Sequence, residues 1–511
     1  MRSDGAFVVL AMFAVVMWTR WPRWLLTGTS GTNADVWRWI IVAAPVVAGL
    51  SIKAAEVPRP WRFLIRAVGT VLAVYGVSTI QPFALDLHAS ALAGQAYLAL
   101  PLIGLLCAIF GWWRPSLYVL PVVAVSWYRE EFSRCIGFPT ANGEELTLQE
   151  CALFLLVGGI ALAIWKRLRP SQSAGIASVF STLVMSACAI HFGNYYFSAV
   201  AKLRLDGGVL DWITANKTYL LMPAADGIGT LALSDYGLAE PAYRLFRAHI
   251  LLFNLVTLGI QLAAVVAIPF AATTRLMLLI YDGMHASIAV LTGIFFYVWM
   301  CLNIAFAIAL GFVSVRFTWL TRLIFIGLTL LSTRAFTIFE AGWYDTSTYN
   351  RVSIEAVMDD GRSIRVSPRI FGVLSYYFYS DYALDPVWKS RNALPTAFYG
   401  TAYTSGVRQI AEACSLPSEH GEPLVLRPLV ETTLRRLQPG VVDPRRLWYS
   451  PLPFPPQHFL ESRAPFQDAR SIDSKAIIAY RFRWEGRCVI ETDEGYAFRI
   501  LGSAETTVPM R

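Results

Sequence analysis

An apolar run between residues 174 and 202 contains five polar side chains whose types and spacing could carry out chemistry. These are His191, Asn194, Tyr195, Ser198 and Lys202. At 3.6 residues per helical turn, all of them fall within about 60° of His191, so they form one polar stripe on an apolar helix. An ammonium inside the membrane loses its hydration, which favours the neutral amine and makes Lys202 a candidate base. In the alternative interpretation, Lys202 extends to the lipid headgroups and the stripe only packs helices.

A second polar stripe runs through residues 275–313. Its members are Asp282, His285, Thr292, Trp299 and Asn303. They share one helical face if the helix is continuous, but 39 residues are too many for one crossing, so the run contains two helices or one broken helix. A carboxylate three residues before an imidazole can orient it, and His285 could then shuttle protons. The alternative is a buried histidine that only packs.

A third run places Arg247, Asn254 and Gln261 at intervals of seven, the spacing of a helix seam, for which we expect hydrogen bonds between helices. Three polar seams in consecutive long helices suggest one shared cavity. Aromatic residues such as Tyr195 and Trp299 flank these seams. Flat apolar walls with a few polar groups suit a quinone-like or lipid-like ring.

The composition shows which kind of protein must position these residues. Of 511 residues, 56% are hydrophobic and only 15% are charged, with a mean hydropathy of +0.49, whereas a soluble domain has about 25% charged residues. These values indicate a polytopic membrane protein and exclude a disordered chain or a disulfide-dense secreted scaffold. The net charge of +8 comes with arginines at the ends of apolar runs, so we expect membrane lipids as partners and no nucleic acid. The cysteines form no CxxC pair and no zinc spacing, so we expect small packing residues and no metal site.

Apolar runs predict eight to ten membrane spans before residue 344. The runs are 6–19, 38–52, 63–84, 90–111, 115–128, 151–166, 174–202, 247–270, 275–313 and 321–339. The first run lacks a small-residue cleavage site, which favours a retained helix over a signal peptide. The fold class is therefore mainly α, a transmembrane helical bundle over residues 1–344.

The distribution of charge predicts the orientation of the spans. The basic segments 53–66, 166–173 and 314–322 are expected on the cytosolic side. The segments 129–150 and 203–246 are expected to face outward. One more crossing places the C-terminal tail on the extracytosolic side.

The tail, residues 345–511, has the pattern of a soluble mixed α+β domain. One hairpin is expected from 351–357 to 362–366 around Asp360-Gly361, and a second from 476–484 to 487–492 around Glu485-Gly486. Residues 404–415 and 424–438 read as helices. The proline-rich stretch 440–456 reads as a loop.

Two strings of residues resemble a known family. The string from His191 through Tyr195, Tyr196 and Phe197 to Lys202-Leu203, followed by Asp211-Trp212, is similar to the Tyr-Phe…Lys-Leu…Asp-Trp pattern of vitamin K-dependent gamma-carboxylases and their bacterial HTTM relatives. The string that begins at Asp282-Gly-Met-His285 also looks like a segment of that group. The resemblance covers about residues 174–340.

The resemblance implies a membrane-embedded site in which a lysine deprotonates a reduced quinone, a vitamin K-type hydroquinone. Oxygenation with O2 then yields a strong base, so that CO2 can add to a glutamate side chain of a peptide or protein on the extracytosolic side. Lys202 falls on the position of the lysine, with His191 and His285 as further catalytic candidates. The candidates for holding the cofactor are Asn194, Tyr195, Ser198, Asp282 and Trp299. The family has a further catalytic histidine before the lysine helix; here His88 is the only earlier histidine, so His191 would have to substitute for it.

Two other functions stay open on these residues. The first is a non-catalytic membrane module whose outward tail binds a partner. The second is a transporter that uses the polar seams as a path, which the absence of a repeated set of spans in the sequence disfavours. A thiol-redox protein is disfavoured because no cysteine pair has redox spacing.

Overall fold

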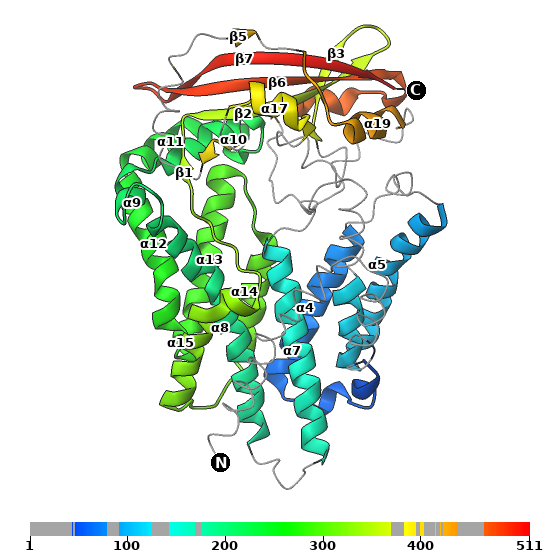
Figure 1. Ribbon diagram of the computed structural model, residues 1–511, viewed down its shortest axis with the longest axis vertical. Coiled ribbons are helices and arrows are strands. Elements are labelled where there is room, and N and C mark those ends of the chain that lie inside the picture. Colours follow the sequence, from blue (N-terminus) through cyan, green and yellow to red (C-terminus); the bar gives the residue numbers. More distant parts are fainter. Residues whose placement is uncertain are drawn as a thin grey trace. The chain divides into compact units, whose positions relative to one another are not determined.

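The described chain is mainly helical with a C-terminal β region, as the sequence predicts (Figure 1). The computed structural model describes residues 43, 46–78, 91–124, 143–168, 175–368, 383–394, 399–402, 414, 419–420, 423–436 and 464–510. Several sequence predictions fall outside the described residues. They are the span 6–19, His88, the loop 440–456 and the helix 404–415 apart from residue 414.

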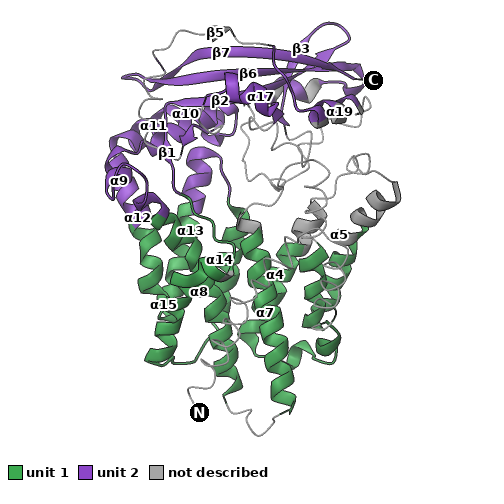
Figure 2. Ribbon diagram, in the orientation of Figure 1, with its two compact units in different colours: residues 1–200, 259–284, 296–341 green, residues 201–258, 285–295, 342–511 purple. Residues whose placement is uncertain are grey.

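The chain divides into two compact units (Figure 2). Unit 1 comprises residues 1–200, 259–284 and 296–341. Unit 2 comprises residues 201–258, 285–295 and 342–511. The C-terminal region therefore forms a compact unit together with two segments from the first 344 residues.

Long helices dominate the first 340 residues. They are α4 (Arg59–Ser78), α5 (Ala91–Gly111), α7 (Gly143–Leu168), α8 (Ile176–Leu203), α12 (Ile250–Ala267), α13 (Ala271–Thr292), α14 (Tyr297–Leu310) and α15 (Trp319–Ala335). In the described part of the chain, three helices are long and apolar enough to cross a membrane, namely Leu146–Leu168, Ile176–Leu203 and Ile250–Ala267. The predicted run 275–313 is two helices, α13 and α14.

The interior of unit 1 shows why these helices pack closely. Helix α4 contacts α5, α7 and α14. Its Trp61 is buried, and the indole nitrogen donates a hydrogen bond to the carbonyl of Leu155 on α7 at 2.8 Å. A side chain at Gly159 would overlap the Trp61 ring, so the glycine provides the space for the indole. In the same unit, the Thr318 side chain caps α15 by accepting a bond from the backbone of Thr321.

Unit 2 contains short helices and two sheets. Its helices are α9 (Asp211–Ala215), α10 (Leu221–Ile228), α11 (Ala239–Ala248), α17 (Pro386–Asn392) and α19 (Pro428–Arg436). Its strands are β1 (Tyr344–Asp345), β2 (Thr348–Met358), β3 (Ser363–Val366), β4 (Thr401–Ala402), β5 (Glu419–His420), β6 (Ile477–Glu491) and β7 (Tyr496–Pro509). Short 3-10 helices connect elements of both units: η1 (Ala54–Glu56), η3 (Pro115–Tyr118), η5 (Thr218–Leu220), η6 (Ala232–Tyr236), η11 (Ala464–Ser471) and η12 (Ser474–Ala476).

The five-stranded sheet has the order β3-β2-β6-β7-β5, and β1 pairs with β4 in a separate two-stranded sheet. Only the β5–β7 pair of the larger sheet is parallel. Helix α10 packs on β2, where Tyr349 is buried with Met222 in one apolar cluster. This cluster joins the early segment of unit 2 to the sheet.

One predicted hairpin is confirmed and the other is wrong. Strands β2 and β3 pair antiparallel around Gly361, which has a positive φ of 86°. The second predicted turn, at Glu485-Gly486, lies inside β6, which continues to Glu491. Gly486 marks a register shift between β6 and β7, a bulge rather than a turn. The chain reverses after Glu491 instead, where Thr492 and Gly495 bond to each other.

A disulfide joins Cys414 to Cys488 on β6, with their Cα atoms 5.6 Å apart. The sequence did not predict this pair, because 74 residues separate the two cysteines and neither lies in a recognisable spacing motif. The described free cysteines are Cys107, Cys151, Cys188 and Cys301. Of these, Cys151 and Cys188 are fully buried, as expected for small packing residues.

Candidate functional site

The predicted stripe on α8 is a buried face of one continuous helix. His191 and Asn194 are fully buried, Tyr195 and Ser198 are nearly so, and Lys202 is 7% exposed. The first four residues belong to unit 1, and Lys202 belongs to unit 2. Lys202 therefore does not extend into open solvent.

Asn303 of α14 is the centre of a hydrogen-bond cluster inside unit 1. Its amide nitrogen donates to the Tyr195 hydroxyl and to Oδ1 of Asp282, both at 2.9 Å. Its amide oxygen lies 2.8 Å from Nε2 of His191. We call these four residues the Asn303 cluster. They come from α8, α13 and α14, so the cluster ties three helices together.

The cluster also determines the tautomer of His191. Both amide hydrogens of Asn303 are donated, so its oxygen must accept a hydrogen from Nε2 of the imidazole. Nδ1 of His191 has no hydrogen-bond partner in the described part of the chain. In the neutral imidazole this leaves Nδ1 as the acceptor.

Aromatic rings surround the Asn303 cluster. Tyr195 stacks on Tyr281 with ring centroids 3.6 Å apart. Trp299 lies 6.1 Å from His191 and 5.8 Å from Tyr195, and Phe306 stacks on His191 at 6.0 Å. The predicted combination of polar groups and aromatic walls is therefore present. In unit 1 these rings contact one another and the cluster.

Asn194 and Ser198 bind the backbone that follows α15. Oδ1 of Asn194 accepts a bond from the backbone nitrogen of Phe339 at 2.8 Å. The Ser198 hydroxyl donates to the carbonyl of Phe339 at 3.1 Å and accepts from the nitrogen of Ala341 at 3.0 Å. These two residues, predicted to bind a cofactor, thus provide hydrogen-bond partners for backbone groups of a segment that is in neither a helix nor a strand.

The second predicted stripe is broken. Helix α13 ends at Thr292, and Gly293 has a φ of 74°, where a side chain would overlap the carbonyl of Thr230. Trp299 and Asn303 therefore lie on another helix, α14. Asp282 still meets Asn303 through the fold. His285 is buried and belongs to unit 2, as does Lys202.

The third predicted seam also divides. Asn254 makes the expected bonds within unit 2: its amide donates to the carbonyl of Asn216 at 2.9 Å and its oxygen accepts from Thr218 at 2.9 Å. Arg247 forms an ion pair with Glu491 of β6 at 3.0 Å. These contacts hold the early segment of unit 2 together and attach it to the sheet.

Lys202 lies among buried groups of unit 2. Its amine is 5.2 Å from the centre of the Trp212 ring, a cation–π distance. The Trp212 indole donates to the carbonyl of Trp343 at 2.9 Å, which fixes the ring. The charge of Lys202 also acts on the buried carboxylate of Asp345. Lys202, Trp212 and Asp345 are called the Lys202 site below.

Asn216 holds Asp345 with two hydrogen bonds. The Asn216 amide donates to Oδ2 of Asp345 at 2.8 Å, and the Asp345 backbone nitrogen donates to the Asn216 oxygen at 2.7 Å. Burial raises the pKa of Asp345 to about 6, although the bond from Asn216 and the charge of Lys202 lower it. A carboxyl group with this pKa can exchange a proton near neutral pH.

Sequence reasoning missed Asp345 and Asn216. A signal for Asp345 exists, because it is the only charged residue between Glu340 and Arg351. Asn216 gives no such signal, since it follows α9 in a segment with many polar residues. Asn303 was placed in a stripe, but its position at the centre of the cluster depends on the break at Gly293.

Comparisons with protein-family models, with curated proteins and with solved structures gave no match to this chain. The similarity of residues 174–340 to carboxylases stays a prediction.

The Asn303 cluster generates a prediction about stability. Asn303→Leu keeps the approximate volume but takes a bond from two buried partners, His191 and Tyr195, and from the partly buried Asp282, which should cost about 3 kcal/mol. We expect a clear fall in the unfolding temperature of the purified protein, followed with a thiol-reactive dye that reports exposure of Cys151 and Cys188. Asn392→Leu is the matched control, because among the described residues the Asn392 side chain bonds to the Trp388 carbonyl of its own helix and to no other group. An equal shift in both variants would contradict a central role for Asn303.

Asp345 generates a prediction about pH. Its folded-state pKa is about 6 and its unfolded value is 3.8. Protonated Asp345 therefore favours the folded state below about pH 4, and this contribution is lost as the pH rises through 6. The loss is on the order of 3 kcal/mol. We expect Asp345→Asn to show a smaller fall in unfolding temperature between pH 4.5 and 7.5 than the unchanged protein, whereas parallel curves would be evidence against the shift.

Proposed function

We propose that the chain is a multi-pass integral membrane protein with its C-terminal β region on the extracytosolic side. Three membrane-length helices support this proposal. Rows of large apolar side chains are exposed on α5 and α12, including Leu102, Leu106, Leu252 and Val256. Such rows would be costly in water and are typical of a surface that faces lipid.

Two observations support the outward placement of the tail. The segment 201–258 and the tail belong to the same unit, and the charge pattern predicts an outward position for both. The disulfide between Cys414 and Cys488 fits an oxidising compartment outside the cytosol.

Reporter fusions test the orientation. Alkaline phosphatase fused after residue 511 should be active, and a green fluorescent protein at the same position should be dark, because the first needs export and the second fails to mature after export. Fusions after residue 168, in the segment predicted to be cytosolic, should give the reverse pattern. A fluorescent fusion after residue 511 would overturn the orientation.

We further propose that the protein is an enzyme in which Lys202 accepts a proton from a lipophilic substrate. The burial of the amine beside Asp345 and Trp212 carries this proposal. Removal from water favours the neutral amine, which is the form that can accept a proton, and Asp345 can balance the positive charge that forms when Lys202 takes up a proton.

A reduced quinone is the substrate class that the resemblance suggests, and the Lys202 site fits it in part. When bound, a reduced quinone would supply a weakly acidic ring hydroxyl. Trp212 offers a flat wall and Lys202 a proton acceptor. Asn194 and Ser198 already bond to the backbone after α15, so Lys202 and Trp212 are the residues that we assign to holding the ring. Carboxylation of a peptide glutamate with CO2 and O2 is part of the proposal through the resemblance alone.

A non-catalytic membrane module is the second candidate function. The Asn303 cluster favours it, because its four residues bond to one another and the rings around it pack together. Under this alternative, the polar groups inside the helices only fix their packing, and the tail carries the function.

The enzyme proposal is tested with Lys202→Met. The unchanged protein, once purified, should retain an extractable quinone, detected by mass spectrometry. It should also consume added naphthohydroquinone in the presence of O2 and CO2. In Lys202→Met, loss of the base should lower the rate of hydroquinone consumption by at least about a hundredfold. The unfolding temperature should change by only a few degrees.

Lys217→Met is the matched control, because Lys217 belongs to the same unit but is half exposed and pairs with Glu491. It should keep the full rate. A protein that neither retains a quinone nor consumes the hydroquinone would refute the enzyme proposal. Joint loss of folding and activity in Lys202→Met would favour the module.

A further inference from the structure

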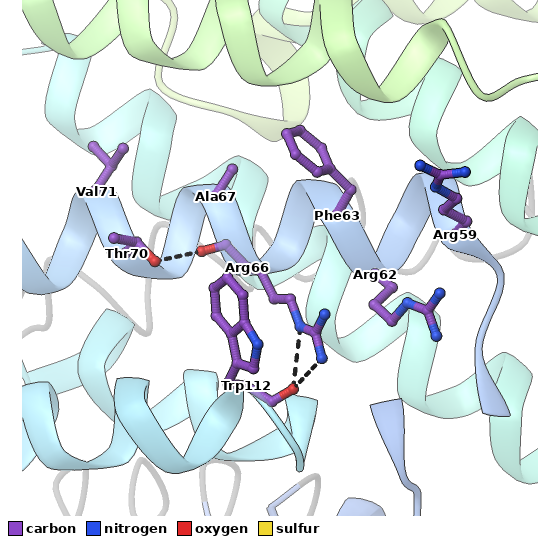
Figure 3. Close-up of a pocket in the computed structure, with 8 residues that line it drawn as sticks. All are labelled: Arg59, Arg62, Phe63, Arg66, Ala67, Thr70, Val71 and Trp112. Atoms are coloured by element: carbon purple, nitrogen blue, oxygen red, sulfur yellow. Dashed lines mark hydrogen bonds between the residues drawn. The ribbon is translucent and has the colours of Figure 1, made fainter. Parts of the chain in front are cut away.

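A pocket of about 540 Å³ in unit 1 lies along α4 (Figure 3), and none of its lining residues belongs to the Asn303 cluster or to the Lys202 site. Three arginines at positions i, i+3 and i+7 of α4 line it, namely Arg59, Arg62 and Arg66. Phe63 and Trp112 contribute apolar wall. Arg62 and Arg66, four residues apart, share one side of the helix.

The pocket carries positive charge that the residues described by the structure do not balance. Its lining contains no acidic residue. Glu56, the acid closest in sequence to the three arginines, is engaged by Arg167 at 2.6 Å. In the described part of the chain, no carboxylate pairs with Arg59, Arg62 or Arg66. A concave site with uncompensated arginines favours an anionic ligand.

Two of the arginines are held in place for such a ligand. Nε and Nη2 of Arg66 donate to the carbonyl of Trp112 at 3.1 and 2.6 Å, and its guanidinium lies 4.5 Å from the centre of the Trp112 ring. Nη1 of Arg62 donates to the carbonyl of Ala54 at 3.3 Å. Each guanidinium has five N–H donors, so both keep donors for a further acceptor. Figure 3 shows Arg62 and Arg66 on the same side of α4, whereas Arg59 points away from them, and its guanidinium lies over the Phe312 ring.

The surroundings of the pocket indicate what the anion is attached to. Helix α5 leads to Trp112 and exposes an apolar row at helical spacing, Leu102, Leu106 and Ile109, which Trp113 continues just after the helix. Each of these side chains is 50 to 60% exposed. Tryptophans at the end of an apolar row mark the level of lipid headgroups. A free phosphate ion would use only the arginines. A ligand with a phosphate and acyl chains would use the arginines and the row on α5.

We propose that this pocket binds the phosphate of an anionic phospholipid, with Arg62 and Arg66 on the phosphate oxygens and the acyl chains along α5. The guanidinium fork matches phosphate oxygens and binds them more specifically than an ammonium would. The arginines of the site belong to segment 53–66, for which the charge pattern predicts a cytosolic position. The site does not depend on Lys202 and is separate from the proposed enzyme activity.

The experiment measures lipid retention by native mass spectrometry of the full-length protein. Protein released from nanodiscs with equal amounts of phosphatidylglycerol and phosphatidylcholine should keep at least one phosphatidylglycerol preferentially. Arg62→Gln should weaken retention about tenfold, and the double variant with Arg66→Gln should abolish the preference. Arg316→Gln is the matched control, since Arg316 is exposed, lies in another basic segment of unit 1 and does not line the pocket. It should keep the preference.

Two further measurements distinguish loss of the lipid site from loss of the fold. Arg66→Gln removes the bonds to Trp112, so unfolding temperatures are measured in detergent without added lipid, and Arg66→Lys tests charge without the fork. A folded Arg66→Lys with reduced preference supports the site. Unchanged preference in a folded double variant, or equal retention of phosphatidylcholine, overturns it. Competition by millimolar inorganic phosphate or glycerol phosphate as strong as that by the lipid would assign the pocket to a soluble phosphate and overturn the lipid.

Discussion

The structure depends on one constraint: polar groups inside apolar helices must find their partners within the protein. Asn303 meets this constraint for three helices at once, because a side-chain amide can donate twice and still accept. Without it, His191, Tyr195 and Asp282 would each lose a buried partner. The same constraint explains the bonds of Asn194 and Ser198. Their side chains pair with backbone groups after α15 that no helix or sheet partner satisfies.

The constraint also separates two kinds of polar residue. Groups of the Asn303 cluster bond mainly to one another, and their geometry is that of a structural element. The Lys202 site differs, because it buries two ionisable groups, the amine of Lys202 and the carboxyl group of Asp345. Removing their charges from water costs free energy. Buried titratable groups of this kind are frequent at functional sites, and this contrast is why we propose chemistry for Lys202 rather than for His191.

The sequence alone predicted the helical composition, the C-terminal β region, the β2–β3 hairpin and the buried face of α8. These features depend on local periodicity, which a single sequence contains. The sequence could not predict the hydrogen bond between Asn303 and Asp282. That contact requires the left-handed turn at Gly293, whereas glycine in a long apolar run is also compatible with a continuous helix. The second hairpin was misplaced for a similar reason: a glycine can mark a bulge as well as a turn, and only the pairing of β6 with β7 distinguishes them. The disulfide and the Asn216–Asp345 contact join residues far apart in the chain.

Helix α8 has one more consequence. Its 28 residues extend about 42 Å, whereas the hydrocarbon layer is about 30 Å thick. An upright helix of this length must overhang the layer, and Lys202 is its penultimate residue. Lys202 is only 7% exposed within the protein itself, so Trp212 and its neighbours keep water from the amine without acyl chains. Extraction from the bilayer should therefore leave the surroundings of the amine intact.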